Sequence, residues 1–280
     1  MAKDLIIGAF TKLSYEDVTP WVRSIKECGF EGDKVIVAID VADEVSRKLA
    51  KDGFTVIAAP AQGNMRIHME RFIHIFNFLK TNDKWQDYRY VITTDVRDVI
   101  FQKNPSEFLE QTIKPFEDTK LVAVSEAIKI KDEPWNKDNI EKNFGAYFYD
   151  YVKDSDVFNV GTLAGDSEYI KDLCAMIFQM SLGRPDWVAD QAVYNVMVNM
   201  EPYKSVMIRS TLEDGWACNL HVTNKPDQME EFGPYLLEPR PTIKDGKVYN
   251  QHDEEFYIVH QWDRVPELVQ FVRSKYHSEK

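Results

Sequence analysis

Two aspartates follow a short apolar segment and could bind a metal ion. Residues 90–94 read Tyr-Val-Ile-Thr-Thr and lead into Asp95 and Asp98, and a second apolar run then ends at Asn104 and Pro105. Two carboxylates three residues apart at a strand end can bind one hard divalent cation, which in turn neutralises a diphosphate. The same residues also suit a plain turn, because the short Asp side chain bonds to nearby backbone. The spacing alone leaves both interpretations open.

The elements around these aspartates alternate between strand-like and helix-like patterns. Expected strands cover residues 5–10, 34–40, 54–58 and 90–93, and expected helices cover 21–28, 43–51 and 66–80. Such alternation predicts βαβ units and an α/β fold with a mainly parallel sheet flanked by helices. Ligands of these sheets bind beyond the carboxyl ends of the strands. Thr11 and Asp40 fall at such ends, and Arg66 precedes the long helix. All three are candidates, by position, for base, ribose or phosphate contacts.

The second half of the chain is less regular. Residues 132–150 are polar and aromatic, and we expect a mobile loop there. A strand and turn over 158–165 precede a helix that Asp166 could cap. Several prolines after residue 224 suggest an irregular arm, followed by a short strand that ends at His260.

Composition excludes some classes of protein. The formal net charge of −12 argues against a nucleic-acid partner, since phosphate-backbone binding depends on clustered Lys and Arg. No apolar run reaches the ~20 residues of a transmembrane helix, and the first residues have too short an apolar stretch for a secretory signal. Cys28, Cys174 and Cys218 show neither a disulfide nor a zinc pattern. We therefore expect a soluble protein of a reducing compartment, the cytoplasm.

The aspartate segment resembles the metal motif of the GT-A glycosyltransferases, Asp-x-Asp after an apolar strand. Residues 98–105, Asp-Val-Ile-Phe-Gln-Lys-Asn-Pro, match the part that begins at the second Asp of that motif. Val96 stands where the first Asp would be, and Asp95 lies one position earlier. The resemblance thus makes Asp98 a metal ligand, while Asp95 could bind either metal or the nucleotide ribose.

Three further segments resemble the same family and occur in its order. Asn159 and Gly161 look like its Asn-x-Gly segment, which borders the donor sugar. Asp190 and Gln191 look like its Asp-Gln segment beside the reacting carbon, and His260 looks like the late histidine that completes the metal shell. Taken singly, these are an ordinary turn, a polar helix start and a structural histidine. Their order along the chain makes coincidence a poor explanation.

The resemblance implies a GT-A-like fold and a metal-dependent transfer. One domain over 1–280 would comprise a nucleotide-sugar-binding half (1–105), an acceptor and catalytic half (106–224), and a C-terminal arm (225–280) that returns to the metal site. With Mn²⁺ or Mg²⁺, it would move a sugar from a UDP-sugar to a glycan acceptor. Residues 94–102 are also similar to glycosyltransferases of large algal viruses, including a capsid-glycan xylosyltransferase. That similarity suggests UDP-xylose as donor and a virus-infected host cell.

The residues leave the mechanism open. If the anomeric configuration inverts, which we expect, a carboxylate must take the acceptor's proton, and Asp190 is the candidate base. If it is retained, Asp190 and Gln191 would orient the sugar instead. A catalytically silent glycan-binding module is the alternative from another class. A sugar-nucleotide pyrophosphorylase ranks lower, because residues 8–12, Gly-Ala-Phe-Thr-Lys, lack the glycine-rich loop of those enzymes.

Overall fold

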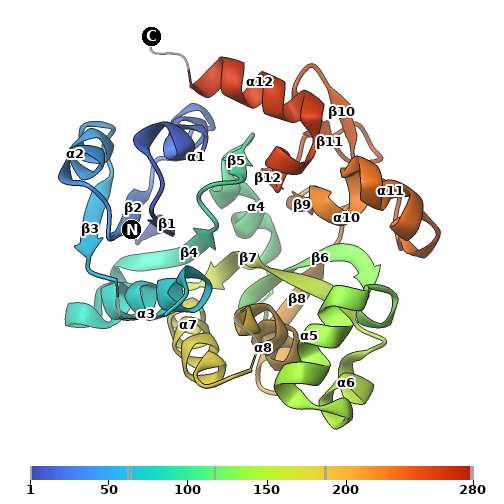
Figure 1. Cartoon of the computed structure of the whole chain (residues 1–280). Coiled ribbons are helices and arrows are strands. Elements are labelled where there is room, and N and C mark those ends of the chain that lie inside the picture. Colours follow the sequence, from blue (N-terminus) through green and yellow to red (C-terminus); the bar gives the residue numbers. More distant parts are fainter. Residues whose placement is uncertain (1, 62, 64, 117, 186–187, 278–280) are drawn as a thin grey trace.

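Residues 2–61, 63, 65–116, 118–185 and 188–277 are described by a computed structural model, and a seven-stranded sheet forms their centre (Figure 1). In spatial order its strands are β3 (Thr55–Ala59), β2 (Asp33–Ile39), β1 (Lys3–Thr11), β4 (Tyr88–Thr94), β7 (Asp156–Asp166), β6 (Leu121–Lys129) and β8 (Met207–Ser210). β7 is antiparallel to both neighbours, and the other pairs are parallel. The predicted α/β class with a mainly parallel sheet is confirmed.

Helices cover both faces of this sheet. The α-helices are α1 (Tyr15–Glu27), α2 (Asp43–Lys51), α3 (Ile67–Lys80), α4 (Pro105–Thr112), α5 (Pro134–Phe144), α6 (Ala146–Val152), α7 (Ser167–Ser181), α8 (Ala189–Val198), α9 (Tyr203–Val206), α10 (Leu220–Asn224), α11 (Pro226–Phe232) and α12 (Pro266–Tyr276). Short 3-10 turns are η1 (Thr81–Asp87), η2 (Ile130–Asp132), η3 (Gly233–Tyr235) and η4 (Trp262–Arg264).

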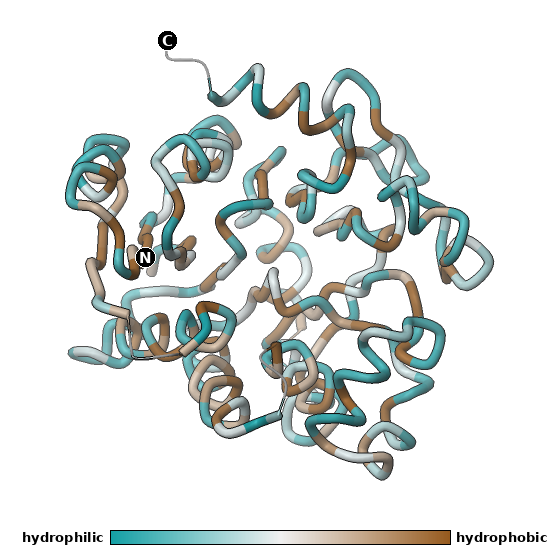
Figure 2. The backbone as a smooth tube through the Cα atoms, in the orientation of Figure 1, coloured by the Kyte–Doolittle hydropathy of each residue, from teal (hydrophilic) through white to brown (hydrophobic). Residues whose placement is uncertain are grey.

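Two hydrophobic cores lie on opposite faces of the sheet. Ile6 of β1 packs in the core that contains Trp21 of α1, and its neighbour Ile7 packs in the core that contains Phe72 and Ile75 of α3. Successive residues of a strand point to opposite faces, so a sheet covered on both sides needs apolar residues at consecutive positions. Figure 2 shows the hydrophobic residues concentrated along these central strands. This is why the strands read as continuous apolar runs in the sequence.

The expected helix over residues 21–28 is real but begins earlier, at Tyr15. Ser14 and Asp17 form a capping box there: each side chain bonds to the backbone N–H of the other. Such reciprocal caps satisfy N–H groups that have no partner within the helix. The helix predicted over 43–51 has those same bounds in α2.

The expectation of a mobile loop over residues 132–150 is wrong. The segment folds into η2, α5 and α6. Glu133 begins α5 by accepting hydrogen bonds from the backbone N–H groups of Trp135 and Asn136, and Pro134 occupies the first helical position. Proline suits that position because its missing N–H would have no helical partner there.

The C-terminal arm is more regular than expected. It contains α11, a hairpin of β10 (Thr242–Lys244) and β11 (Lys247–Tyr249), and α12. β12 (Ile258–His260) lies between β5 (Val99–Phe101) and β9 (Ala217–Asn219) in a small second sheet. Its register places His260 opposite both Val99 and Asn219. The arm therefore brings His260 beside Asp98, which immediately precedes β5.

The three expected subdivisions of the chain share these sheets. The central sheet takes strands from both 1–105 and 106–224, and β12 of 225–280 completes the small sheet together with strands of the other two ranges. None of the helices in the part of the chain that the structure describes combines the length and apolar character needed to span a membrane.

Candidate active site

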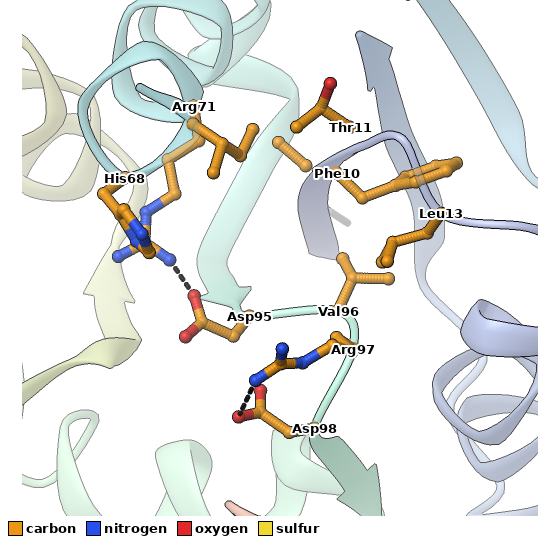
Figure 3. Close-up of a pocket in the computed structure, with 11 residues that line it drawn as sticks. Phe10, Thr11, Leu13, His68, Arg71, Asp95, Val96, Arg97 and Asp98 are labelled. Atoms are coloured by element: carbon orange, nitrogen blue, oxygen red, sulfur yellow. Dashed lines mark hydrogen bonds and ion pairs between the residues drawn. The ribbon is translucent and has the colours of Figure 1, made fainter.

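Two adjoining cavities open at the carboxyl ends of β1 and β4. The smaller, of about 280 Å³, is lined by the last residues of β1, by residues that follow β1 and β4, and by the start of α3 (Figure 3). The larger, of about 460 Å³, extends toward α5, α8 and β12. The chain leaves β1 toward β2 on one side and returns to β4 on the other, which makes this the switch point where α/β sheets bind ligands.

Asp95, Asp98 and His260 form a cluster suited to a metal ion at the boundary of the two cavities. One ligand atom from each lies within 4.8 Å of the others. His260 Nε2 is 3.5 Å from Asp95 Oδ2 and 3.7 Å from Asp98 Oδ1. Among the residues that the structure describes, this is the group of His, Cys, Asp and Glu side chains with such geometry. The predicted metal ligands are thus close together.

The imidazole of His260 is held in the orientation that a metal ligand needs. Its Nδ1 lies 2.8 Å from Oδ1 of Asn219, an acceptor, so Nδ1 carries the proton and Nε2 presents its lone pair to the carboxylates. Burial lowers the pKa of His260, against the opposing effect of Asp98. A neutral ring with an anchored Nδ1–H is the usual state of a metal-binding histidine.

Gly161 lies against this cluster and leaves no room for a side chain. A Cβ there would stand 2.5 Å from Cε1 of His260, 2.8 Å from Oδ1 of Asn159 and 2.9 Å from Oδ2 of Asp95. The Gly161 carbonyl also accepts a hydrogen bond from the Asp95 backbone N–H, at 2.8 Å. Close approach of these three side chains therefore favours glycine at this position.

Arg71 of α3 connects the cluster of Asp95, Asp98 and His260 to α8, a role that the sequence did not reveal. Its guanidinium pairs with Asp95 and, at 3.1 Å, with Oδ2 of Asp190 (the Asp95 pair is drawn in Figure 3). The Arg71 and Asp190 side chains are 8% and 1% exposed, so that pair is shielded from water, whereas Asp95 is 32% exposed. The helical periodicity of residues 66–80 was visible, but which of its polar residues faced the site was not.

Asp190 and Gln191 line the larger cavity, but both already interact with other protein groups. Asp190 is 1% exposed, and burial raises its pKa while Arg71 opposes that rise. Gln191 accepts a hydrogen bond from the Val160 N–H and donates one to the Phe158 carbonyl, both at 3.0 Å. Gln191 therefore fixes the backbone of β7 on either side of Asn159.

The residues proposed by position alone lie at different distances from the cavities. Thr11 lines the smaller cavity. Asp40 and Arg66 are exposed and are not among the lining residues. His68, the second residue of α3, lines both cavities instead, and burial together with nearby Arg71 lowers its pKa to about 4. Of the three residues proposed by position, Thr11 is thus the one that lines either of these cavities.

Glu126 is the main site residue that sequence reasoning missed. It lies near the end of β6, lines the larger cavity and accepts a 2.6 Å hydrogen bond from Nδ2 of Asn159. Burial raises its pKa to about 7, although the bond from Asn159 acts in the opposite direction. The one available signal was a single acid inside an apolar strand, Val-Ser-Glu-Ala-Ile, where a charge is costly unless it has a function.

A comparison with models of known protein families finds no match for this chain, and neither does a comparison with curated proteins.

Proposed function

We propose that this protein is a GT-A-type glycosyltransferase, which uses Mn²⁺ or Mg²⁺ to transfer a sugar from a UDP-sugar to a glycan hydroxyl. The observation that carries the proposal is the cluster of Asp95, Asp98 and His260 at the boundary of two cavities. Two carboxylates and a neutral imidazole are a donor set that suits these cations. Its place at the switch point of the sheet is where a nucleotide would bind.

The two cavities differ in the way that the two ends of a nucleotide sugar differ. Phe10, Leu13, Ile67 and Val96 give the smaller cavity apolar walls that suit the flat face of a base. The larger cavity is lined mainly by polar side chains, among them Asn136, which suit a sugar and an acceptor. In this proposal the diphosphate lies between them, beside the metal cluster.

Cationic side chains at the boundary would help to bind the diphosphate. Arg97 lines both cavities, is 53% exposed and lies 3.5 Å from a carboxylate oxygen of Asp98 (Figure 3). An exposed arginine can exchange such a weak pair for a phosphate, which it binds in bidentate fashion. A bound cation would supply Lewis-acid stabilisation of the departing diphosphate.

Calorimetry with nucleotide sugars tests the proposal. UDP-xylose, UDP-glucose and UDP-galactose would be titrated with Mn²⁺ and with a chelator, starting with UDP-xylose because of the viral resemblance. We expect at least one to bind only with the metal. Asp98→Asn should abolish that binding, because it removes ligand charge at nearly constant volume, and His74→Ala, on α3 outside both cavities, should not. Equal affinity with and without chelator would contradict the metal role. Metal-dependent binding without UDP release would favour the silent binding module.

A further inference from the structure

The larger cavity contains several carboxylates, and their partners differ. Among the described residues, five carboxylates line it: Asp95, Asp98, Glu126, Glu133 and Asp190. Arg71 pairs with Asp95 and Asp190, and Arg97 lies beside Asp98. Glu133 uses both oxygens to accept backbone N–H groups at the start of α5. Glu126 alone in this set has neither an arginine partner nor a helix to cap.

Glu126 is held by one oxygen and leaves the other available. Its Oε1 accepts the hydrogen bond from Asn159, and Oε2 has no hydrogen-bond partner among the described residues. Oδ1 of Asn159 accepts the Gly161 N–H at 2.7 Å, so a single amide links Glu126 to the strand beside the metal cluster. The carboxylate is thus positioned relative to the metal site without being one of its ligands.

The residue after Glu126 has an unusual backbone conformation, which interrupts the regular β6 strand. Ala127 has φ 58°, a left-handed value that costs a residue with a Cβ about 1 kcal/mol or more. Its N–H donates to Oγ of Ser125 at 3.0 Å, and its carbonyl accepts the N–H of Leu237 at 2.8 Å. The β6–β7 register shifts on both sides of Ser125. Bulges of this kind re-aim side chains near active sites.

We propose that Glu126, and not Asp190, is the general base of the transfer reaction, an inference that rests on the proposed function. The acceptor hydroxyl oxygen forms the bond to the anomeric carbon, and its proton passes to the Glu126 carboxylate. The bond between that carbon and the β-phosphate oxygen breaks, and its electron pair leaves with the nucleoside diphosphate. The product has inverted configuration. Asp190 acts as a positioning residue that holds Arg71.

The environment of Glu126 agrees with this role. The titratable groups that face it are Glu133, from the start of α5, and His260, from β12. Its pKa of about 7 gives substantial amounts of both the proton-accepting form and the form produced by the reaction near neutral pH, the condition in which a general base works best.

Kinetics of Glu126→Gln test the proposal. The amide keeps the size and the bond from Asn159 but cannot accept a proton. Turnover would be measured as UDP release from the UDP-sugar that binds best with Mn²⁺, with water and a panel of methyl glycosides as acceptors, since attack by either releases a proton. We expect donor affinity within about twofold of wild type and turnover lower by ~10²–10⁴-fold. Glu238→Gln is the matched control: that carboxylate accepts a hydrogen bond from the backbone N–H of Leu212 and, like Glu126, has a pKa raised by burial, but it lies outside both cavities.

The outcomes separate this inference from the proposed function. Wild-type turnover in Glu126→Gln, a loss explained by weaker donor binding, or retained configuration in the product by NMR would each overturn the base assignment and leave the transferase intact. Absence of metal-dependent donor binding by the wild-type protein would overturn both. If Glu126→Gln does not fold, Glu126→Asp decides: moving the carboxylate by one methylene should lower turnover at unchanged donor affinity, and wild-type turnover would refute the role.

Discussion

The buried carboxyl of Glu126 should make the free energy of unfolding depend on pH, and Glu126→Gln should remove this dependence. Burial raises its pKa from the ordinary 4.5 to about 7 in the folded state. The folded chain then binds the proton more tightly than the unfolded chain. The associated stability is complete below pH 4.5, is lost progressively as the pH rises to about 7, and changes no further above that. At ~1.4 kcal/mol for each tenfold change in proton affinity, the loss is about 3 kcal/mol.

Urea unfolding at a series of pH values between 4.5 and 8 would measure this effect. A chelator should be present throughout, because a metal that binds the folded state adds stability of its own. Gln at position 126 carries no titrating proton. The free energy of unfolding of Glu126→Gln, relative to wild type, should therefore rise by about 3 kcal/mol across this range. The surface substitution Glu231→Gln, which removes the same charge from an exposed position, controls for general charge effects.

Parallel stability curves for wild type and Glu126→Gln would refute this reasoning. They would mean that Glu126 is ionised in the folded protein as readily as in the unfolded chain, and hence that water or an unrecognised cation reaches it. A rise in relative stability confined to Glu126→Gln would instead confirm that the carboxyl is desolvated. The result is independent of any assay of activity.

The remaining predictions concern the metal cluster. His260→Ala should weaken Mn²⁺ binding, measured by calorimetry, far more than His74→Ala, and equal small effects would make His260 structural. Asn219→Ala removes the acceptor for the Nδ1–H of His260, and loss of such an outer partner should weaken Mn²⁺ binding by ~10–100-fold; unchanged affinity would show that packing alone orients the ring. Gly161→Ala places a methyl group within 3 Å of three site atoms. It should therefore lower the free energy of unfolding in urea by ~1–3 kcal/mol and weaken Mn²⁺ binding. Unchanged stability and unchanged Mn²⁺ affinity would mean that the strand shifts to make room.

Much of the fold could be predicted because its signals are local. Consecutive apolar residues predicted the buried parallel strands, and residues 43–51 and 66–80 carried helical patterns that the structure follows closely. The segment 132–150 was the exception. Its many polar and aromatic residues suggested a loop, whereas the cap at Glu133 and packing against α8 and η2 make it helical.

Within the site, the sequence predicted the residues that lie together at the end of a single strand. Asp95 and Asp98 are three residues apart directly after β4, and the turn between β4 and β5 keeps both at the cavity. Gly161 was recognisable because Asn159 and Gly161 together resemble a short Asn-x-Gly segment. These features need only short stretches of chain.

Only the tertiary structure decided which distant residues meet them. The antiparallel pairing of β12 with β5 brings His260 to Asp98, a contact between residues far apart in the chain that no local pattern encodes. Arg71 lies on the side of α3 that faces the cavities, whereas Arg66, just before the helix, is exposed. Glu126 lines the cavity beside the left-handed turn at Ala127. Ala127 donates its N–H to Oγ of Ser125 and accepts the N–H of Leu237, and the second of these bonds joins residues far apart in the chain.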